Sequence, residues 1–193
     1  LLSINKKLID PVAKRRFFVS FPYAILELKN NAKILEIRNH PTSELGKRRI
    51  KIKGNTTVYI PHLDAANIQE GEIIRLKDFC SIKIEKKIPT QIQIHNKKMN
   101  TYLMAGHEVE VENVDKKIQW VDDNNKVEVE VLMIRELFIG EKYNENSLEI
   151  LEGFVEKEVL NDQIKEIFQF ERFGFVILDE KSDNKLSYIF ICK

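Results

Sequence analysis

Two planar polar side chains, those of Gln169 and Arg172, give this sequence its clearest chemistry. An amide offers both a donor and an acceptor, so Gln169 can pair with the edge of a nucleic-acid base. A guanidinium presents several donors in a planar fork, so Arg172 can pair with a base edge or with a phosphate. The competing interpretation is a satisfied polar pair on a strand, with Glu171 as the partner.

A strand must position these groups, because the segment Phe168–Phe175 alternates apolar and polar residues. Residues two apart in a strand share a face, so Phe168, Phe170 and Arg172 are expected on one side. Gln169 is then expected on the other side, unless a turn at Gly174 rotates this register.

Two clusters of cations lie in the first half of the chain. Lys14-Arg15-Arg16 precedes two phenylalanines, and the segment Lys47–Lys53 alternates cations with apolar residues along much of its length. One face of that strand would be nearly all positive, which is costly unless the face is solvated or paired with an anion. Single-stranded RNA needs cations for phosphates, edge-binding groups and stacking groups, and all three types occur here. The alternative is an edge strand that lysines guard against edge-to-edge pairing.

The charge distribution also favours RNA binding by the first half. The net charge is +1, but residues 1–98 carry 20 Lys and Arg against 9 Asp and Glu, and residues 99–193 carry 11 against 21. A basic half can neutralise phosphates, whereas an acidic half repels them. The alternative is an ordinary solvated surface with charges of both signs.

No catalytic constellation is visible in the sequence. The glycines form no phosphate-binding loop of the GxGxxG or Walker type, and the many carboxylates fall on strand faces expected to be solvated. The histidines are scattered, which favours structural or surface roles over catalysis. They are His40, His62, His95 and His107.

The length and the cysteines set further bounds. A chain of 193 residues can form one large or two small domains, and it contains no apolar run of about 18 residues that would span a membrane. Cys80 and Cys192 lie far apart without a CxxC or Cys/His cluster, which argues against a disulfide framework and a zinc site. A reducing, cytoplasmic setting fits best. The start lacks a signal peptide and a Met, and it looks like a cut.

The predicted secondary structure is mainly β. Period-two alternation recurs, with turn-type residues between the segments, as in antiparallel sheets that have one face in water. Closure into barrels is the economical way to remove the exposed edges of so many short strands. The predicted strands are Ala24–Lys29, Lys33–Arg38, Arg49–Lys53, Thr57–Ile60, Glu72–Lys77, Ser81–Lys86, Gln91–His95, Glu108–Val114, Lys117–Val121, Val127–Ile134, Ser147–Leu151, Ile167–Glu171, Phe175–Leu178 and Leu186–Cys192.

Little helix is expected. Residues 2–14 fit one helix, with a break or a new N-terminus where Asp10 precedes Pro11, and single turns are expected at Asp64–Ala66 and Asn161–Lys165. The strand pattern between about 78 and 145 is self-contained, which favours a nested layout of two barrels.

Six segments, in order, resemble landmarks of the anticodon-binding part of the class I glutamyl- and glutaminyl-tRNA synthetases. Each alone is weak, but the ordered set is specific and covers most of the chain. They are Arg15–Pro22, the loop Asn39-His40-Pro41 followed by Gly46-Lys47-Arg48, Gly71–Lys77, Ile118–Val121, Asn146–Glu149 and Phe168–Phe175.

This resemblance implies an all-β fold with two antiparallel β-barrels, proximal and distal, of a kind also found in a ribosomal protein family, and a short N-terminal helix. Residues 1–15 would be a helical connection to a catalytic part absent from this chain. Residues 16–77 plus 146–193 would form the proximal barrel, and residues 78–145 the distal barrel.

The resemblance also implies an anticodon-binding site, with no catalytic and no metal-binding residue in this chain. Lys77 stands where the glutaminyl branch has Arg. The residues that match contact positions of that branch, or lie near them, are Arg15, Lys77, Gln169, Arg172, Arg75 and His40.

The chain departs from the family pattern at four positions. Phe21 stands where Asp usually precedes Pro22, and Thr42 replaces a base-contacting Asn. Ala66 and Asn67 replace a basic pair, so those base contacts do not transfer. The end of the chain lacks the Asn-Arg-Thr sequence of glutaminyl enzymes, which favours an archaeal-type glutamyl enzyme.

The resemblance therefore implies the C-terminal, anticodon-binding region of glutamate-tRNA ligase, an enzyme that uses ATP and Mg²⁺ in its own catalytic domain. The chain itself would need no cofactor and would bind tRNA(Glu), with tRNA(Gln) left open; neither DNA nor a membrane is an expected partner. The alternatives are a glutamine-tRNA ligase domain, a ribosomal-type RNA-binding β-barrel, and a protein-interaction scaffold that uses the acidic half.

Overall fold

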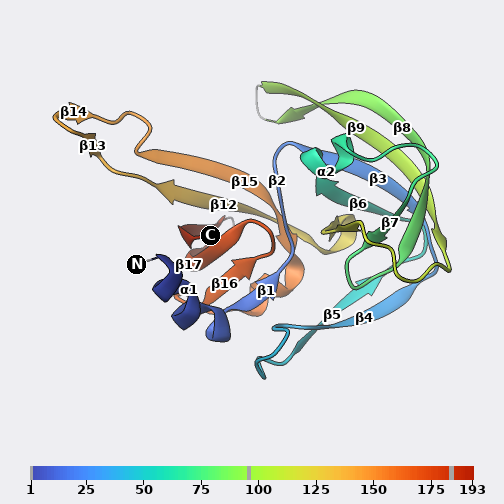
Figure 1. Cartoon of the computed structure of the whole chain (residues 1–193), viewed down its shortest axis with the longest axis horizontal. Helices are drawn as coiled ribbons and strands as arrows, with labels where there is room; N and C mark the ends of the chain where they lie inside the picture. Colours follow the sequence, from blue (N-terminus) through green and yellow to red (C-terminus); the bar gives the residue numbers. More distant parts are fainter. Residues whose placement is uncertain (1, 95–96, 183–184) are drawn as a thin grey trace.

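The computed structural model describes residues 2–94, 97–182 and 185–193. His95, which the sequence placed at the end of a strand, lies outside the described residues, as do Asp183 and Asn184 of a predicted turn. Most of the chain forms strands, and two curled sheets lie side by side (Figure 1). The expected all-β fold with a short N-terminal helix is confirmed.

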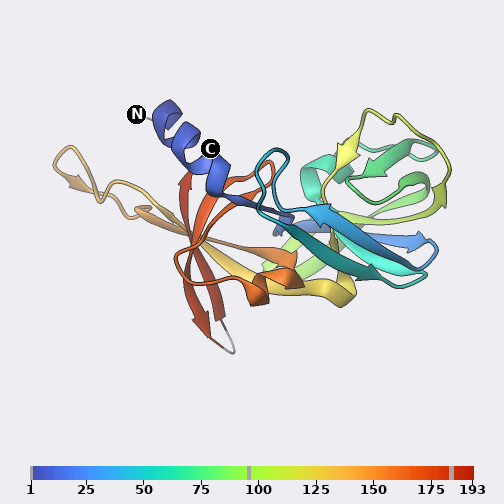
Figure 2. The ribbon, with the colours of Figure 1, turned by 90° about the horizontal axis from the view of Figure 1, so that it is seen from below.

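The chain begins with helix α1, Leu2–Ile9, and the 3-10 turn η1, Asp10–Val12. The predicted helix over residues 2–14 therefore ends at Ile9, just before the break expected where Asp10 precedes Pro11, and Lys14 already belongs to a strand. Ile9 packs with Ala13 and Cys192, so α1 lies beside the last strand of the chain (Figure 2). The last two residues of the expected helical connection 1–15, Lys14 and Arg15, therefore belong to strand β1.

The first sheet has the order β1-β16-β17-β18-β12-β15-β2 and combines both ends of the chain with its later middle part. Its strands are β1 Lys14–Arg16, β2 Phe18–Ser20, β12 Lys126–Ile134, β15 Leu148–Glu156, β16 Ile167–Phe170, β17 Gly174–Ser182 and β18 Lys185–Cys192. The β12–β15 ribbon projects from the body and carries the hairpin β13 Phe138–Ile139 and β14 Lys142–Tyr143 at its tip (Figure 1). The 3-10 turn η3, Lys157–Asn161, follows β15.

The second sheet has the order β10-β7-β8-β9-β3-β6-β11. Its strands are β3 Tyr23–Lys29, β6 Thr56–Pro61, β7 Ile73–Leu76, β8 Ser81–Ile94, β9 Lys97–Val109, β10 Lys117–Ile118 and β11 Val121–Asp122. Helix α2, His62–Ala66, follows β6, and the hairpin β4 Lys33–Arg38 and β5 Lys47–Ile52 extends from this half. The 3-10 turn η2, Asp123–Asn125, leads back to the first sheet.

The pairing of the strands does not follow the expected bounds of the two barrels. Strands β3, β6 and β7 pair within the sheet of β8 and β9, so residues 23–77 lie with the middle of the chain and not with its end. Strand β12 pairs with β15 and β18 of the other sheet. Parallel pairs such as β3–β9 join strands far apart in sequence, and strand alternation contains no information about such partners.

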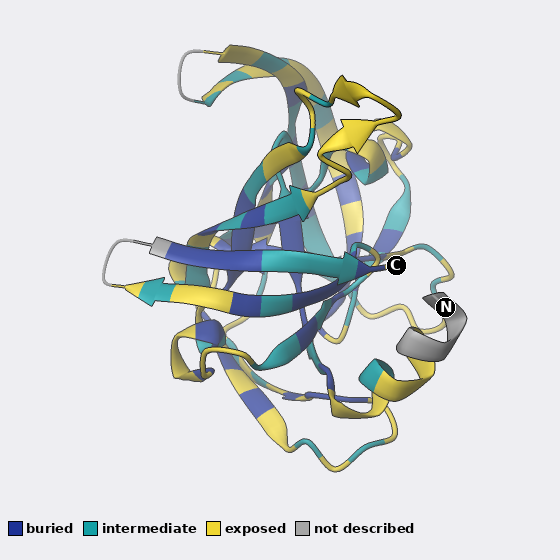
Figure 3. Cartoon of the chain, turned by 90° about the vertical axis from the view of Figure 1, so that its left-hand side faces the viewer, coloured by how far each residue is buried: buried dark blue, intermediate teal, exposed yellow. Residues whose placement is uncertain are grey.

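The two sheets have separate cores, and the adjacent residues Phe17 and Phe18 contribute to different ones. Phe17 packs with Trp120 in the core of the second sheet, and Phe18 stacks on Phe170 in the core of the first. Consecutive side chains of an extended backbone point to opposite sides, so one dipeptide contributes to both cores. Figure 3 shows that buried and exposed residues alternate along some of the strands, as they do along β5. None of the described helices has the length and apolar character of a membrane span.

The chain returns from the second sheet to the first through a polar cluster at η2. The Lys126 ammonium donates hydrogen bonds of 2.8 Å to Asp123 and 2.9 Å to the Tyr59 hydroxyl, which itself donates to Asp123. The hydrogen bonds from Lys126 and Tyr59 lower the pKa of Asp123, and the bond from Lys126 has the larger effect. Asp122 beside it is buried and accepts a hydrogen bond from Thr56. Side-chain hydrogen bonds therefore hold the chain in place where it passes from the second sheet to the first.

Two buried arginines fix the first crossing. The Arg16 guanidinium, 1% exposed as a residue, donates to both carboxylate oxygens of Asp162 at 2.9 and 3.0 Å. Arg48 donates through Nε to Glu156 at 2.6 Å, and the other oxygen of Glu156 accepts from the Phe17 N–H at 2.9 Å. These contacts connect β1, the next residue Phe17 and β5 to the end of β15 and to the segment after it.

Replacing Glu156 with Gln should lower the free energy of unfolding by about 3–5 kcal/mol, because the buried Arg48 would lose its counter-charge. Urea titration followed by circular dichroism measures the change. The matched control is Glu149→Gln on the same strand, where the exposed pair with Arg135 contributes about 1 kcal/mol or less. Equal losses in the two variants would contradict this role for Arg48 and Glu156.

Candidate nucleic-acid interface

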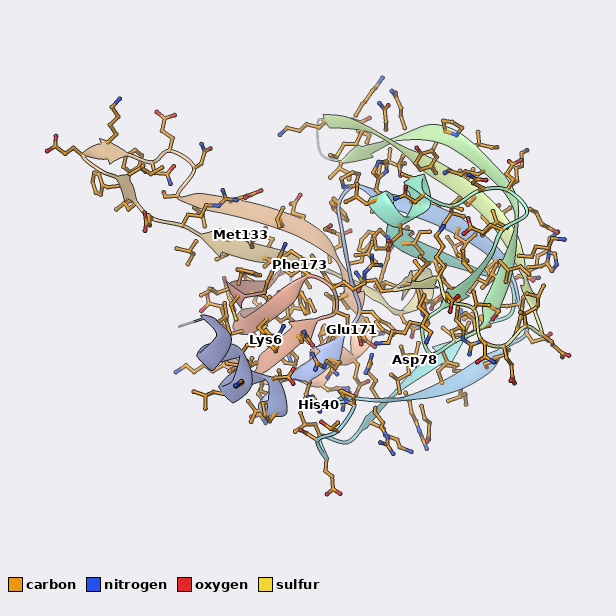
Figure 4. The ribbon with its side chains drawn as sticks, in the orientation of Figure 1. Lys6, His40, Asp78, Met133, Glu171 and Phe173 are labelled. Atoms are coloured by element: carbon orange, nitrogen blue, oxygen red, sulfur yellow. The ribbon has the colours of Figure 1, made fainter. Side chains whose placement is uncertain are left out.

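A polar cavity of about 890 Å³ lies between the two sheets and next to the β4–β5 hairpin. Figure 4 labels three of its residues, Lys6, Glu171 and Asp78, which come from α1, the turn after β16 and the turn after β7. The lining residues are Lys6, Asp10, Arg15, Glu36, Ile37, Arg38, Pro41, Arg75, Lys77, Asp78, Gln169, Glu171 and Arg172. The cavity therefore contains five of the six residues that the resemblance singled out.

Strands β1 and β16 form one wall. They run parallel, with Arg15 opposite Gln169, so the guanidinium and the amide leave the sheet as neighbours. The Arg15 N–H donates a 2.6 Å hydrogen bond to the Asn39 carbonyl, which joins the end of β4 to the same wall. Because Arg16 points into the core, alternation along β1 directs Arg15 into the cavity.

The turn after β16 brings Arg172 to the same side as Gln169. Arg172 has φ +62, so the backbone leaves strand geometry there and not first at Gly174. Phe173 then packs against Phe18 and Phe190, away from Gln169. The expected grouping of Arg172 with the buried phenylalanines is therefore wrong, and the cause is this positive φ.

Arg172 forms a two-pronged ion pair with Asp64 of α2, with distances of 2.5 and 2.9 Å. The hydrogen bonds that the guanidinium donates to Asp64 raise the pKa of Arg172. Since β16 belongs to the first sheet and α2 follows a strand of the second, this pair connects the two halves across the cavity.

Strand β7 and the residue after it form the opposite wall. The Lys77 N–H donates to the Ile118 carbonyl at 2.9 Å, and its own carbonyl accepts from the Trp120 indole at 2.9 Å. The Lys77 ammonium reaches across to Glu171. Arg75, also half-buried, donates to the Ser81 hydroxyl at 3.1 Å.

His40, which the resemblance placed near the anticodon-binding site, does not line the cavity. It is 2% exposed, and its Nδ1 accepts hydrogen bonds from the N–H groups of Thr42 and Ser43 at 3.2 and 2.7 Å. The imidazole therefore shapes the loop after β4, and Pro41 is the residue of that loop that reaches the cavity.

Aromatic stacking groups are missing from the residues that line the cavity. Phe17 and Phe18, which follow the first basic cluster, are buried in the two cores. Planar guanidinium groups can stack on bases as aromatic rings do, so Arg15 and Arg172 are the planar surfaces available here. Phe17 and Phe18 are therefore not available for stacking on a base, because both sheets need those rings for their cores.

The second basic cluster also divides between core and surface. Arg48, Ile50 and Ile52 point inward along β5, and Lys47, Arg49 and Lys51 are exposed. A positive face therefore exists. Arg48 is absent from this face, because the alternation points its side chain inward, where it pairs with Glu156.

Internal carboxylates neutralise three of the six cations that line the cavity. Arg15 pairs with Asp10 at 2.7 Å, Lys77 with Glu171 and Arg172 with Asp64. Among the described residues, the Gln169 amide forms no hydrogen bond within the chain, so it is free for a ligand. The cavity offers planar hydrogen-bonding groups and charges, and its lining contains no Ser, Cys or His that could act as a nucleophile or a proton shuttle.

Sequence reasoning missed several lining residues, above all Arg38, Glu36 and Asp10. The predicted strand Lys33–Arg38 would have placed Glu36 and Arg38 on one exposed face directly before the loop landmark at Asn39. The alternation of this strand could therefore have identified Glu36 and Arg38 as site residues. No sequence pattern indicates the position of Asp10, because that position depends on how η1 folds back toward Arg15.

Comparisons with known proteins assign most of the chain to one family. A family model described as the anticodon-binding domain of class I tRNA synthetases (E and Q) matches residues 13–101, and a second model with the same description matches residues 117–179.

Curated relatives include three archaeal glutamate-tRNA ligases. That of Pyrococcus horikoshii is 32% identical over 195 residues, that of Sulfurisphaera tokodaii 32% over 191, and that of Methanocaldococcus jannaschii 31% over 185. The matches cover 100%, 98% and 95% of this chain but 31%, 30% and 29% of the relatives. The chain therefore spans about a third of the length of the curated relatives it matches.

Glu36 is a carboxylate of the cavity whose titration reports on its ion pair with Arg49. Hydrogen bonds from Arg49 lower the pKa of Glu36, so its carboxyl should titrate below the ordinary glutamate range in an NMR pH titration. Arg49→Met should move the midpoint up toward the ordinary value. A midpoint that does not respond to this substitution would show that Arg49 leaves Glu36 unpaired in solution.

Proposed function

The chain belongs to the anticodon-binding family of the class I tRNA synthetases for glutamate and glutamine, and on that basis we propose that it binds the anticodon of tRNA(Glu) in the cavity between its two sheets. The observation that carries this proposal is the convergence of Arg15, Arg75, Lys77, Gln169 and Arg172 on one concavity. These residues come from distant parts of the sequence, and they combine base-edge donors and acceptors with cations.

In this proposal the cavity recognises each base through hydrogen bonds to the edge of the base. Gln169 is half-buried, unpaired within the described residues and adjacent to Arg15, so a base that enters the cavity meets an amide and a guanidinium side by side. Unstacked bases are recognised through such contacts on their edges, and phosphate contacts add affinity without sequence preference. The residues named here contact RNA directly in this proposal and take no part in bond making or breaking.

The full-length protein is proposed to be a glutamate-tRNA ligase, because the curated relatives of matching sequence have that name. Attachment of glutamate would use ATP and Mg²⁺ in a catalytic domain, with this chain as its anticodon-binding part. We propose a cytoplasmic location and the catalytic domain as the partner within the same enzyme.

Glutamine-tRNA ligase is the second candidate, since the family description covers both specificities. The departures at Thr42, Ala66 and Asn67 from the glutaminyl pattern and the names of the relatives favour the glutamyl alternative. A ribosomal-type RNA-binding barrel is the third, and it would bind RNA without regard to the anticodon.

The test is a binding and footprinting series with the 193-residue chain and transcripts of tRNA(Glu), tRNA(Gln) and an unrelated tRNA. Gln169→Ala and Arg172→Ala should each cost about 1–3 kcal/mol in binding to the preferred tRNA and weaken anticodon protection. The exposed Lys51→Ala, outside the cavity, is the matched control.

Unchanged anticodon protection in both cavity variants would refute the site. Equal binding of all three tRNAs by the wild-type chain would support the ribosomal-type alternative instead. Preference for tRNA(Gln) would assign the chain to the glutaminyl branch.

A further inference from the structure

Arg38 is a cation of the cavity without an anion of its own. The chain supplies a carboxylate to Arg15, to Lys77 and to Arg172, whereas the exposed Arg38 side chain forms no ion pair or hydrogen bond with any described residue. The nearest carboxylate along its own strand is that of Glu36, two residues earlier on the same face of β4.

Glu36 is already engaged. Arg49 donates to one of its oxygens through Nε and Nη2 at 2.8 and 2.6 Å, and the Lys47 ammonium lies 3.7 Å from the other. A single carboxylate that serves two cations has little left for a third. Arg38 is therefore uncompensated because its neighbours on β5 take the nearby negative charge.

The strand pairing makes this arrangement costly. Arg38 lies directly opposite Lys47 across β4 and β5, and both side chains are exposed. Like charges directly opposite on one face are destabilising, and an anion bound between or beside them removes the penalty.

The backbone under Arg38 is held rigidly, although the side chain is free. Its carbonyl accepts a 3.0 Å hydrogen bond from Nη1 of the buried Arg48, which is itself fixed by Glu156. The next residue, Asn39, accepts from the Arg15 N–H through its carbonyl and from Arg16 through its side chain at 2.8 Å. Arg38 thus starts from a fixed point on the wall next to Arg15.

We propose that Arg38 binds a phosphate of the RNA strand whose bases enter the cavity, an inference that rests on the proposed function. Its exposure places it at the rim of the cavity, whereas the half-buried Gln169 and Arg15 lie farther inside. A ribose-phosphate backbone that delivers bases to the interior must pass this rim. Arg38 is accordingly a contact for affinity and for strand position, and the bases are read by other residues.

The experiment measures the affinity of the 193-residue chain for its preferred tRNA and for an unrelated tRNA over a series of salt concentrations. Arg38→Gln should weaken binding of both RNAs by the same factor, about three- to tenfold, and reduce the slope of log K against log salt by about 0.7, the value for one phosphate contact on a single strand. Arg38→Lys should keep the slope, because a point charge is sufficient for a phosphate.

Lys51→Gln is the control, since it removes the same charge from an exposed position on β5 outside the cavity. Equal effects of Arg38→Gln and Lys51→Gln would overturn the proposal, because they would report net charge alone. An Arg38→Gln variant that loses preference between the two RNAs at unchanged slope would also overturn it and would make Arg38 a base reader. If the wild-type chain shows no anticodon preference, the proposed function fails even where the phosphate contact stands.

Discussion

The arrangement of this molecule depends on two buried ion pairs at the place where its sheets meet. Arg16 with Asp162 and Arg48 with Glu156 remove four charges from water, which is expensive and offers little net stability over apolar residues of similar size. What such pairs do provide is register, because a buried charge that misses its partner is far more costly than a misplaced apolar side chain. Here they fix β1 and the end of β4 relative to the first sheet, and these two backbones carry the cavity's Arg15 and Arg38.

The same strands therefore serve two purposes through alternation alone. Along β1, Arg16 points into the junction and Arg15 into the cavity, and along β5, Arg48 points inward while its neighbours Lys47 and Arg49 hold Glu36. The inward-pointing side chains hold the strands in position, and the side chains on the opposite face line the cavity or neutralise its charges. A substitution that removes a buried arginine would thus be felt at the site through the backbone, without any direct contact with a ligand.

The sequence was sufficient for the fold class and for most strands, because alternation with period two is a local property. It did not yield the partners of those strands: β9 lies between β8 and β3, and the parallel pair with β3 joins segments far apart in the chain. Within the site, residue type and the family-like segments were sufficient to place Gln169 and Arg15 in one site. The position of Arg172 depends on its positive φ, which the preferences of an arginine do not predict. His40 was misplaced for a different reason, since a histidine that satisfies loop N–H groups and one that faces a ligand look alike in sequence.

The internal carboxylates of the cavity bear on how it would select its ligand. A generic polyanion gains little at Arg15, Lys77 or Arg172, because each phosphate would have to displace Asp10, Glu171 or Asp64. A neutral base edge displaces no charge and can bond with the free amide of Gln169, so base contacts add to binding where phosphate contacts nearly cancel. Negative charge inside a positive cavity therefore favours reading of bases over indiscriminate attraction. Under the proposed function, the unpaired Arg38 at the rim would draw the strand in. The interior, where Arg15 and Lys77 already have carboxylate partners, would decide which strand stays.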